Sequence, residues 1–141
     1  MDHFLATILM FGADFEPRGW AYCNGQVVSI AQNTAVFALL GTTYGGNGQT
    51  TFHLPDMRGR VPMHPGQGPG LSHHDLGEQG GVERVALTPA QSSARPGQIT
   101  AGSGAATAVC IPGASEPHSV LPPYLCVNFI ICLEGVYPSR N

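Results

Sequence analysis

The sequence has no lysine, and only 11% of its 141 residues are charged. Its basic residues are six scattered arginines, and the formal net charge is −3. Proteins that bind nucleic acid through its phosphates need clustered lysine or arginine. We therefore expect no nucleic-acid partner.

Long apolar runs are missing as well. The longest fall at residues 4–11 and 125–133, whereas a helix needs about 20 apolar residues to cross a bilayer. No basic region precedes the first run, so no signal peptide is evident. We expect no membrane insertion, and export would use lysis, injection machinery or another route.

The sequence also lacks a Cys-x-x-Cys pair, which disfavours a structural zinc site. Its four cysteines are Cys23, Cys110, Cys126 and Cys132. The favoured interpretation is that they are small buried hydrophobes. A disulfide from Cys110 to Cys126 or Cys132 is the alternative. Cys126 and Cys132 would lie about 20 Å apart in one extended strand, at ~3.3 Å per residue, so they cannot pair there.

Glycine and proline are abundant, at 19 and 12 residues. They exclude long helices and favour short strands joined by long loops. The length fits a single domain with its own core. We predict a mainly β fold with one short helix, in the α+β class. Because little of the surface is charged, we also expect copies of the chain to cover part of it.

The only tryptophan, Trp20, lies between turn signals. Asn24 and Gly25 form a dipeptide that is typical of a type I′ hairpin turn. The sequence therefore predicts a hairpin whose strands are residues 20–22 and 26–28.

A short helix is expected after this hairpin. Ser29 is a candidate N-cap, and Gln32 stands at the spacing of a capping box. Gly41 is placed to end the helix in a left-handed cap. The side expected to be buried carries four apolar residues: Ile30, Val36, Phe37 and Leu40.

Two apolar segments predict strands. Residues 5–11 are apolar on both faces, which favours a strand buried on both sides or lying at a subunit contact. Residues 124–133 would place apolar side chains on both faces of an extended strand, and they are the clearest strand candidate in the second half of the chain.

The remaining segments are rich in small residues and turn formers. Residues 61–71 predict an ordered loop without long regular structure. Short strands are expected at residues 82–87 and 107–111. Residues 90–113 lack core residues, so they cannot offset their ordering entropy alone. Whether they are ordered, or are held against neighbouring chains, stays open.

Several motifs occur in a fixed order in the first half of the chain. They are Pro17-Arg18-Gly19-Trp20, Cys23-Asn24-Gly25-Gln26, Leu39-Leu40-Gly41-Thr42-Thr43-Tyr44-Gly45-Gly46 and Leu54-Pro55-Asp56-Met57-Arg58-Gly59-Arg60. Together they resemble the phage tail collar domain, in particular the small proteins often labelled microcystin-dependent. The resemblance covers residues 5–70, is loose over 71–118, and resumes in Leu121-Pro122-Pro123-Tyr124-Leu125 and Asn128-Phe129-Ile130-Ile131.

The resemblance implies a compact collar-type domain and a trimeric, fibre-associated attachment module. Residues 1–70 would be its core, 71–120 a variable loop-rich insertion, and 121–141 the closing strand and tail. The residues that match the family signature are expected to be structural: Pro17, Arg18, Gly19, Trp20, Asn24, Gly25, Gly45, Gly46, Pro55, Asp56, Arg58 and Arg60.

No enzyme signature is present. The sequence lacks Gly-x-Ser-x-Gly and His-Glu-x-x-His, and a P-loop needs a lysine. The glycine-rich residues 66–70 look like a phosphate cradle, but Pro69 removes an amide donor there. Glycan hydrolysis lacks a convincing carboxylate pair, with Asp56 and Glu83 as the acids to test. We predict no enzyme and no cofactor.

Weak metal candidates are His73 and His74. Their side chains diverge on an extended chain, so a solvated loop is favoured. Some collar proteins carry a metal-binding His-x-His pair, but residues 92–97 contain none, so that site is not transferred.

Aromatic side chains offer a sugar-binding alternative. Trp20, Tyr22 and Tyr44 could stack on a glycan, although a core position is favoured for Trp20. Tyr44 lies in a glycine-rich loop, so it is the candidate receptor contact.

Two functional hypotheses remain open at this level. The first is a tail or tail-like attachment protein that assembles as a homotrimer and presents residues 71–118 to a cell-surface glycan or protein. The second is a self-assembling subunit of an extracellular filament, built by end-to-end contacts that do not close. In both, the main partner is the chain itself.

Overall fold

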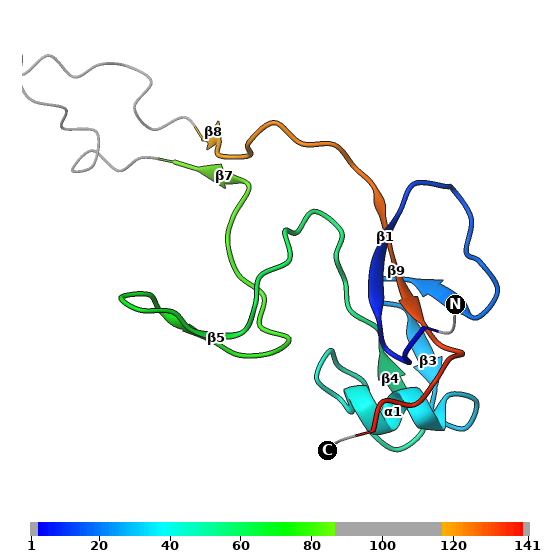
Figure 1. Ribbon diagram of the computed structural model, residues 1–141. Coiled ribbons are helices and arrows are strands. Elements are labelled where there is room, and N and C mark those ends of the chain that lie inside the picture. The colour runs from blue at the N-terminus through cyan, green and yellow to red at the C-terminus, as the bar shows by residue number, and fades with distance from the viewer. Residues whose placement is uncertain (1–2, 87–116, 140–141) are drawn as a thin grey trace, which may run out of the picture. The chain divides into compact units, whose positions relative to one another are not determined.

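The computed structural model describes residues 3–86 and 117–139. Contacts divide the chain into two units: residues 1–79 with 125–141, and residues 80–124. The regular elements are short strands in small antiparallel sheets, with one helix, α1 (Thr34–Leu40), among the described residues (Figure 1). The predicted fold class, mainly β with one short helix, is confirmed.

A three-stranded antiparallel sheet lies in the first unit. Its strand order is β1 (Ile8–Phe11), β9 (Asn128–Cys132) and β2 (Trp20–Tyr22), so the last strand of the chain lies between the first two. β9 is shorter than the predicted strand at residues 124–133. It begins opposite the end of β1, where Asn128 faces Phe11, and earlier residues have no partner strand.

A strained turn leads into β1. Ala6 is the one described non-glycine residue with positive φ, at +64°. Its N–H donates to the Cys132 carbonyl at 3.0 Å, while the Cys132 N–H donates to the Thr7 carbonyl at 3.0 Å. Two residues thus face one, in the pattern of a G1 bulge, where glycine is usual. The bulge sets the register with which β1 enters the sheet.

The predicted type I′ hairpin is wrong. β2 pairs with β9, and β3 (Val27–Ser29) pairs with β4 (Thr51–His53), so the strands that flank Asn24 and Gly25 do not pair with each other. Only Gly25 has positive φ, whereas a type I′ turn needs it at both positions. The Gln26 N–H donates to Asn24 Oδ1 at 3.3 Å, an Asx turn that carries the chain from one sheet to the other.

The predicted capping box is also wrong. The N-cap of α1 is Asn33, and no side chain caps the helix. Ser29 instead ends β3, where it faces Thr51, so it is not free to cap a helix. Gly41 does end the helix, and its N–H donates to the Phe37 carbonyl at 2.8 Å. Its φ of 57° is positive, but its ψ of −138° lies outside the left-handed helical region.

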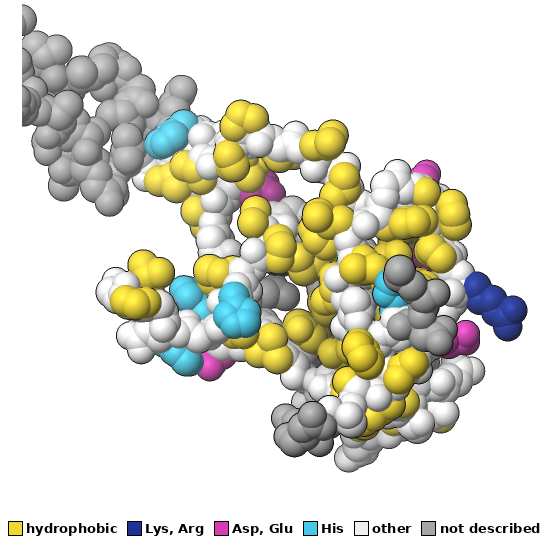
Figure 2. Space-filling view, viewed as in Figure 1, with side chains coloured by type: hydrophobic (Ala, Val, Ile, Leu, Met, Phe, Trp, Pro, Cys, Tyr) yellow, Lys and Arg dark blue, Asp and Glu magenta, His cyan; other side chains and the backbone are white. Residues whose placement is uncertain are grey.

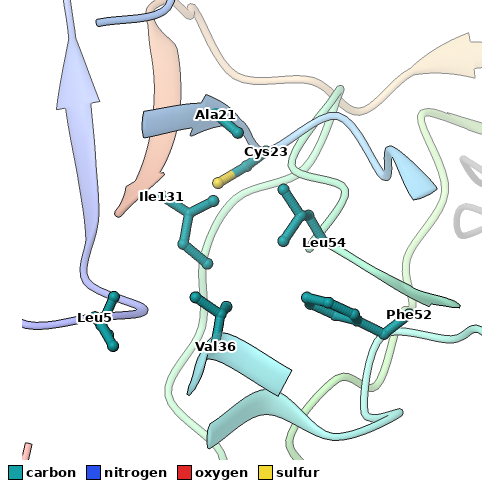
Figure 3. Close-up of a cluster of buried hydrophobic side chains, with 7 residues drawn as sticks. All are labelled: Leu5, Ala21, Cys23, Val36, Phe52, Leu54 and Ile131. Atoms are coloured by element: carbon teal, nitrogen blue, oxygen red, sulfur yellow. The ribbon is translucent and has the colours of Figure 1, made fainter. Parts of the chain in front are cut away.

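One apolar cluster joins these elements into a core. Val36 from α1, Phe52 from β4 and Ile131 from β9 are almost completely buried and converge in Figure 3. The Phe37 and Phe52 rings lie 5.6 Å apart. The remaining buried members of the cluster are Leu5, Ala21, Cys23 and Leu54. Of the predicted buried side of α1, Val36 is fully buried, while Ile30, Phe37 and Leu40 are partly buried against the cluster.

The prediction that residues 5–11 are buried on both sides within the chain is wrong. Leu5 is buried, but Ile8, Leu9 and Met10 are exposed. β1 is an edge strand, so only one of its two edges meets the rest of the sheet. The alternative of a subunit contact stays a prediction.

Three cysteines fall within the described residues, and all are free thiols. Cys23 and Cys132 are buried, as predicted. Cys126 is exposed, which contradicts the prediction for it. It lies just before β9, where the chain has no partner strand. Cys110 lies outside the described residues, and both partners proposed for its disulfide, Cys126 and Cys132, are free.

Two short ladders complete the described structure. In the first unit, β5 (Gly66–Gln67) pairs with β6 (His73–His74). In the second unit, β7 (Arg84–Val85) pairs with β8 (His118–Ser119). β7 confirms the strand predicted within residues 82–87. The predicted strand at 107–111 and the loop at 90–113 lie outside the described residues.

Candidate functional site

The signature loop around Asp56 is built on backbone contacts between two distant segments. The Met57 N–H donates to the Cys23 carbonyl at 2.8 Å, and the Gly25 N–H donates to the Pro55 carbonyl at 3.2 Å. Gly25 has a φ of +75°, and a Cβ there would lie 3.2 Å from Asp56 Cβ. Glycine at this position therefore allows the two segments to lie together.

An ion pair closes this loop. Asp56 Oδ1 accepts from Arg58 Nε at 2.8 Å and Oδ2 accepts from Arg58 Nη2 at 2.9 Å, a bidentate arrangement. The Arg58 N–H also donates to Oδ1 at 3.1 Å. These hydrogen bonds from Arg58 lower the pKa of Asp56 to about 2.

The second arginine of the motif lies against the backbone. Arg60 Nη1 donates to the carbonyls of Asp56 and Arg58, at 3.3 and 3.2 Å. All three charged groups thus bond to one another or to their own loop. This geometry matches the expected structural network, although that role itself stays a prediction.

Two other signature segments also make close backbone contacts. The Gly19 carbonyl accepts from the N–H groups of Leu133 and Glu134, at 2.8 and 3.1 Å. Gly46 forms a bridge with Phe52, and a Cβ on Gly46 would lie only 2.5 Å from Phe52 Cα. Gly46 therefore allows close approach of two main chains, whereas Gly19 leaves room for the Glu134 side chain, whose Cβ would lie 3.0 Å from an added Cβ.

The signature aromatic Trp20 is half-buried and lies outside the main core cluster. Its ring meets His3 edge-on, with ring centroids 5.1 Å apart. The favoured core position is thus only partly observed. Tyr44 is also half-buried; desolvation, and then the nearby Cys23 thiol, raise its pKa. Arg18, two residues before Trp20 in the chain, is exposed.

A small cavity of about 210 Å³ lies next to the Asp56 loop. Tyr22, Asn24, Arg58 and Asn128 contribute polar groups to it. The remaining lining residues are Cys23, Met57, Val127 and Phe129. The cavity brings together three parts of the chain that the sequence analysis treated separately. Asn128 and Phe129 were noted only as part of the closing strand, and no sequence signal placed them beside Arg58.

Cys23 and Tyr22 are the lining side chains whose protonation bears on chemistry in the cavity. Desolvation raises the pKa of the Cys23 thiol to about 11, so the thiol stays protonated near neutral pH. The Tyr22 hydroxyl is buried and has no hydrogen-bond partner within the described residues. Burial, with Asp14 and Glu16 nearby, raises the pKa of Tyr22. Neither group is prepared for nucleophilic or acid–base chemistry.

The candidate metal ligands His73 and His74 have separate carboxylate partners on an exposed hairpin. His73 Nε2 lies 3.1 Å from Asp75 Oδ1, and His74 Nδ1 lies 3.2 Å from Glu78 Oε1. Over the described ranges, no group of three or more His, Cys, Asp or Glu side chains is arranged to hold a metal. The two histidines therefore do not converge on one ion, and the favoured solvated loop takes the form of a short hairpin.

The segment that contains the Asp56 loop and the glycine-rich loop matches a known protein family. Residues 6–62 match the phage tail collar domain. The resemblance inferred from the motifs is confirmed. This collar segment includes β1, β2, β3, α1 and β4, together with the Asp56 network.

One characterised relative is similar to this chain. It is the Short tail fiber protein gp12 of Enterobacteria phage T4, 34% identical over 73 residues. The alignment covers 51% of this chain but only 14% of that protein, so the chain spans a small part of its relative. Among the described residues α1 is the only helix, and with 7 residues it is too short to cross a membrane.

Proposed function

We propose that the chain is a non-enzymatic structural and attachment protein of a phage tail or a phage-tail-like particle, and that it acts as a homo-oligomer. The observation that carries this proposal is the collar match over residues 6–62. The similarity to a tail fibre protein of phage T4 supports the same proposal. Within the segment, signature residues hold backbone segments together, as a scaffold requires.

The acid–base geometry supports the non-enzymatic part of the proposal. Asp56 is paired with Arg58, which lines the cavity. Its low pKa keeps it ionised, so it is not a proton donor at neutral pH. Glycoside hydrolysis needs a second, facing carboxylate with a raised pKa.

Receptor presentation is the finer part of the proposal. Residues 71–120 form the variable insertion, and Tyr44 supplies an aromatic contact from the collar segment. The target is a cell-surface glycan or protein. Weak sites repeated on several copies would combine into useful avidity, because each later contact is intramolecular.

The alternative is a self-assembling subunit of an extracellular filament. Exposed apolar side chains favour it: Met10, Tyr124 and Leu125 are each more than 70% exposed. Figure 2 shows how much of the visible surface is apolar and how few side chains are charged. Such surface favours contacts with further copies.

The test combines light scattering, electron micrographs and binding of labelled protein to intact bacterial cells. A discrete oligomer that binds cells, either a trimer or a pair of trimers, is the result expected for the tail protein. Long polymers without cell binding would support the filament. A monomer that binds no cells would overturn both.

A further inference from the structure

The two edges of the three-stranded sheet differ in their free hydrogen-bonding groups. At the β2 edge, the Trp20 N–H donates to the Pro17 carbonyl at 3.0 Å, and the Tyr22 N–H donates to Glu16 Oε1 at 2.8 Å. The chain's own loop therefore satisfies the outward donors of this edge. It also places a charged side chain there, a common protection against strand addition.

The β1 edge has no such cover. Leu9 faces Ile130 of β9, so alternation along an antiparallel ladder turns the N–H and C=O of Ile8 and Met10 outward. The hydrogen bond from the Cys132 N–H to the Thr7 carbonyl decides which residues turn outward. It shows that Cys132, and by alternation Ile130, direct their backbone groups towards β1. From the parts of the chain that the structure describes, no other backbone segment bonds to these outward groups.

The side chains of β1 are as unprotected as its backbone. Ile8, Leu9 and Met10 are 37%, 38% and 72% exposed. No charged residue and no proline lies between His3 and Asp14. Soluble proteins usually guard an edge strand with one or the other, because an open apolar edge pairs with further strands.

We propose that β1 of one copy pairs antiparallel with β1 of a second copy, about a two-fold axis at Leu9. This register places each outward residue opposite an outward residue, with Ile8 facing the partner's Met10 and Leu9 facing the partner's Leu9. The β2 edge of a second copy cannot serve, because its donors are already bonded. Every facing side chain is apolar, so self-pairing brings no like charges together despite the net charge of −3.

This inference rests on the proposed self-assembly and makes it specific. A two-fold contact is isologous and cannot by itself close a three-fold ring. The assembly therefore contains an even number of copies: two, or six where the contact joins two trimers.

The first test measures particle mass by light scattering for wild type, Met10→Lys and Met63→Lys. Met10 is 72% exposed, so lysine there leaves the core intact and puts a charge on the open edge. Met63 is 67% exposed and lies outside β1, so it is the matched control. Met10→Lys is expected to halve the mass, and Met63→Lys to leave it unchanged.

The second test traps the register as a disulfide in a Cys110→Ser, Cys126→Ser background. These changes remove the exposed thiol among the described residues and the one that lies outside them. In the proposed register, the two copies of residue 9 form a non-hydrogen-bonded pair with Cα atoms about 4.5 Å apart. Leu9→Cys is therefore expected to give a covalent dimer under mild oxidation, and Met10→Cys is expected to give far less.

The outcomes separate this inference from the proposed function. Equal masses for both lysine variants, a wild-type monomer, or an odd number of copies would overturn β1 pairing. If cells are still bound in that case, the tail-protein proposal stands. A mass halved by Met10→Lys in a protein that binds no cells would support β1 pairing and oppose receptor attachment.

Discussion

Asp56 accepts three hydrogen bonds from Arg58, and these depress its pKa from 3.8 to about 2. A carboxyl group whose pKa is lower in the folded state stabilises the fold above its unfolded pKa. That contribution is lost as the pH falls from about 4 towards 2. Asp56→Asn removes the titrating carboxyl group. It also replaces one of the two oxygens that accept from Arg58 with an amide nitrogen, which cannot accept.

We therefore expect wild type to be more stable than Asp56→Asn at neutral pH, with the difference shrinking as the pH falls through this window. Urea unfolding midpoints measured at several pH values would check it. Asp14→Asn, an exposed change of the same charge, is the control. A gap between wild type and Asp56→Asn that stays constant down to about pH 2 would contradict the role of Arg58.

The positive φ of Ala6 makes a second prediction at residue scale. An L residue in the left-handed region is strained by roughly 1–2 kcal/mol, whereas glycine there costs roughly 0.5–1 kcal/mol of chain entropy. Ala6→Gly should therefore stabilise the fold by about 0.5–1 kcal/mol, measured by chemical denaturation. Ala38→Gly, in the exposed part of α1, should destabilise by about 1 kcal/mol. Destabilisation by both changes would show that Ala6 is not strained.

Two aromatic residues differ in burial, and their truncation should differ in cost. Phe52 is fully buried, and Phe52→Ala should cost about 3–5 kcal/mol. Trp20 is half-buried against His3, so Trp20→Ala should cost less, although its side chain is larger. Free energies of unfolding from urea titration would compare them. An equal or larger loss for Trp20→Ala would mean that its indole is covered by another copy.

At the scale of elements, the approach of the glycine-rich loop to β4 gives a sharp test. Gly46 has a φ of +106°, and an added Cβ would meet Phe52 Cα at 2.5 Å and the Thr51 carbonyl oxygen at 2.7 Å. Gly46→Ala must move a main chain, so we expect a loss above about 2 kcal/mol. Gly12 has open space around it, and Gly12→Ala should be nearly neutral. Thermal melts of both variants would decide, and equal melting temperatures would contradict the close approach.

The sequence predicted elements better than it predicted their pairing. The strand at Trp20 and the helix around Val36 were found because local patterns encode them. The hairpin predicted from Asn24-Gly25 was wrong, because β2 pairs with β9, which lies over 100 residues further along the chain. Ser29 misled for the same reason, since pairing with β4 holds it in a strand. The cavity at Arg58 was not predictable, because Asn128 reaches it only through that long-range pairing.

At the scale of the whole molecule, the sequence named residues 5–11 as a candidate subunit contact, but it could not show which part of that strand is open. A low charge fraction indicated that copies of the chain cover one another. Alternation alone could not show which edge of β1 is open, because that depends on the register set by the bulge at Ala6. The structure places the unguarded surface at one edge strand, whereas the opposite edge is closed by the chain's own loop.

The β7–β8 ladder makes a prediction about the chain's organisation. Arg84 faces Ser119, Val85 faces His118, and the Val120 N–H donates to the Glu83 carbonyl at 3.1 Å. The chain therefore leaves and re-enters this ladder at neighbouring points. Residues 87–116 should be replaceable by a two-residue Asn-Gly turn without disturbing the first unit, because such a turn joins antiparallel strands.

We expect this shortened chain to keep the thermal unfolding midpoint of the full chain and to lose cell binding, since most of the proposed receptor-binding insertion at residues 71–120 is removed. Tyr44→Ala in the full chain is the companion variant, and it should weaken binding while those loops stay in place. Cell binding retained by the shortened chain but lost in Tyr44→Ala would move the receptor contact to the collar segment. Loss of the folded state in the shortened chain would instead mean that residues 87–116 contribute to the core, and the insertion would then have to be treated as part of the scaffold.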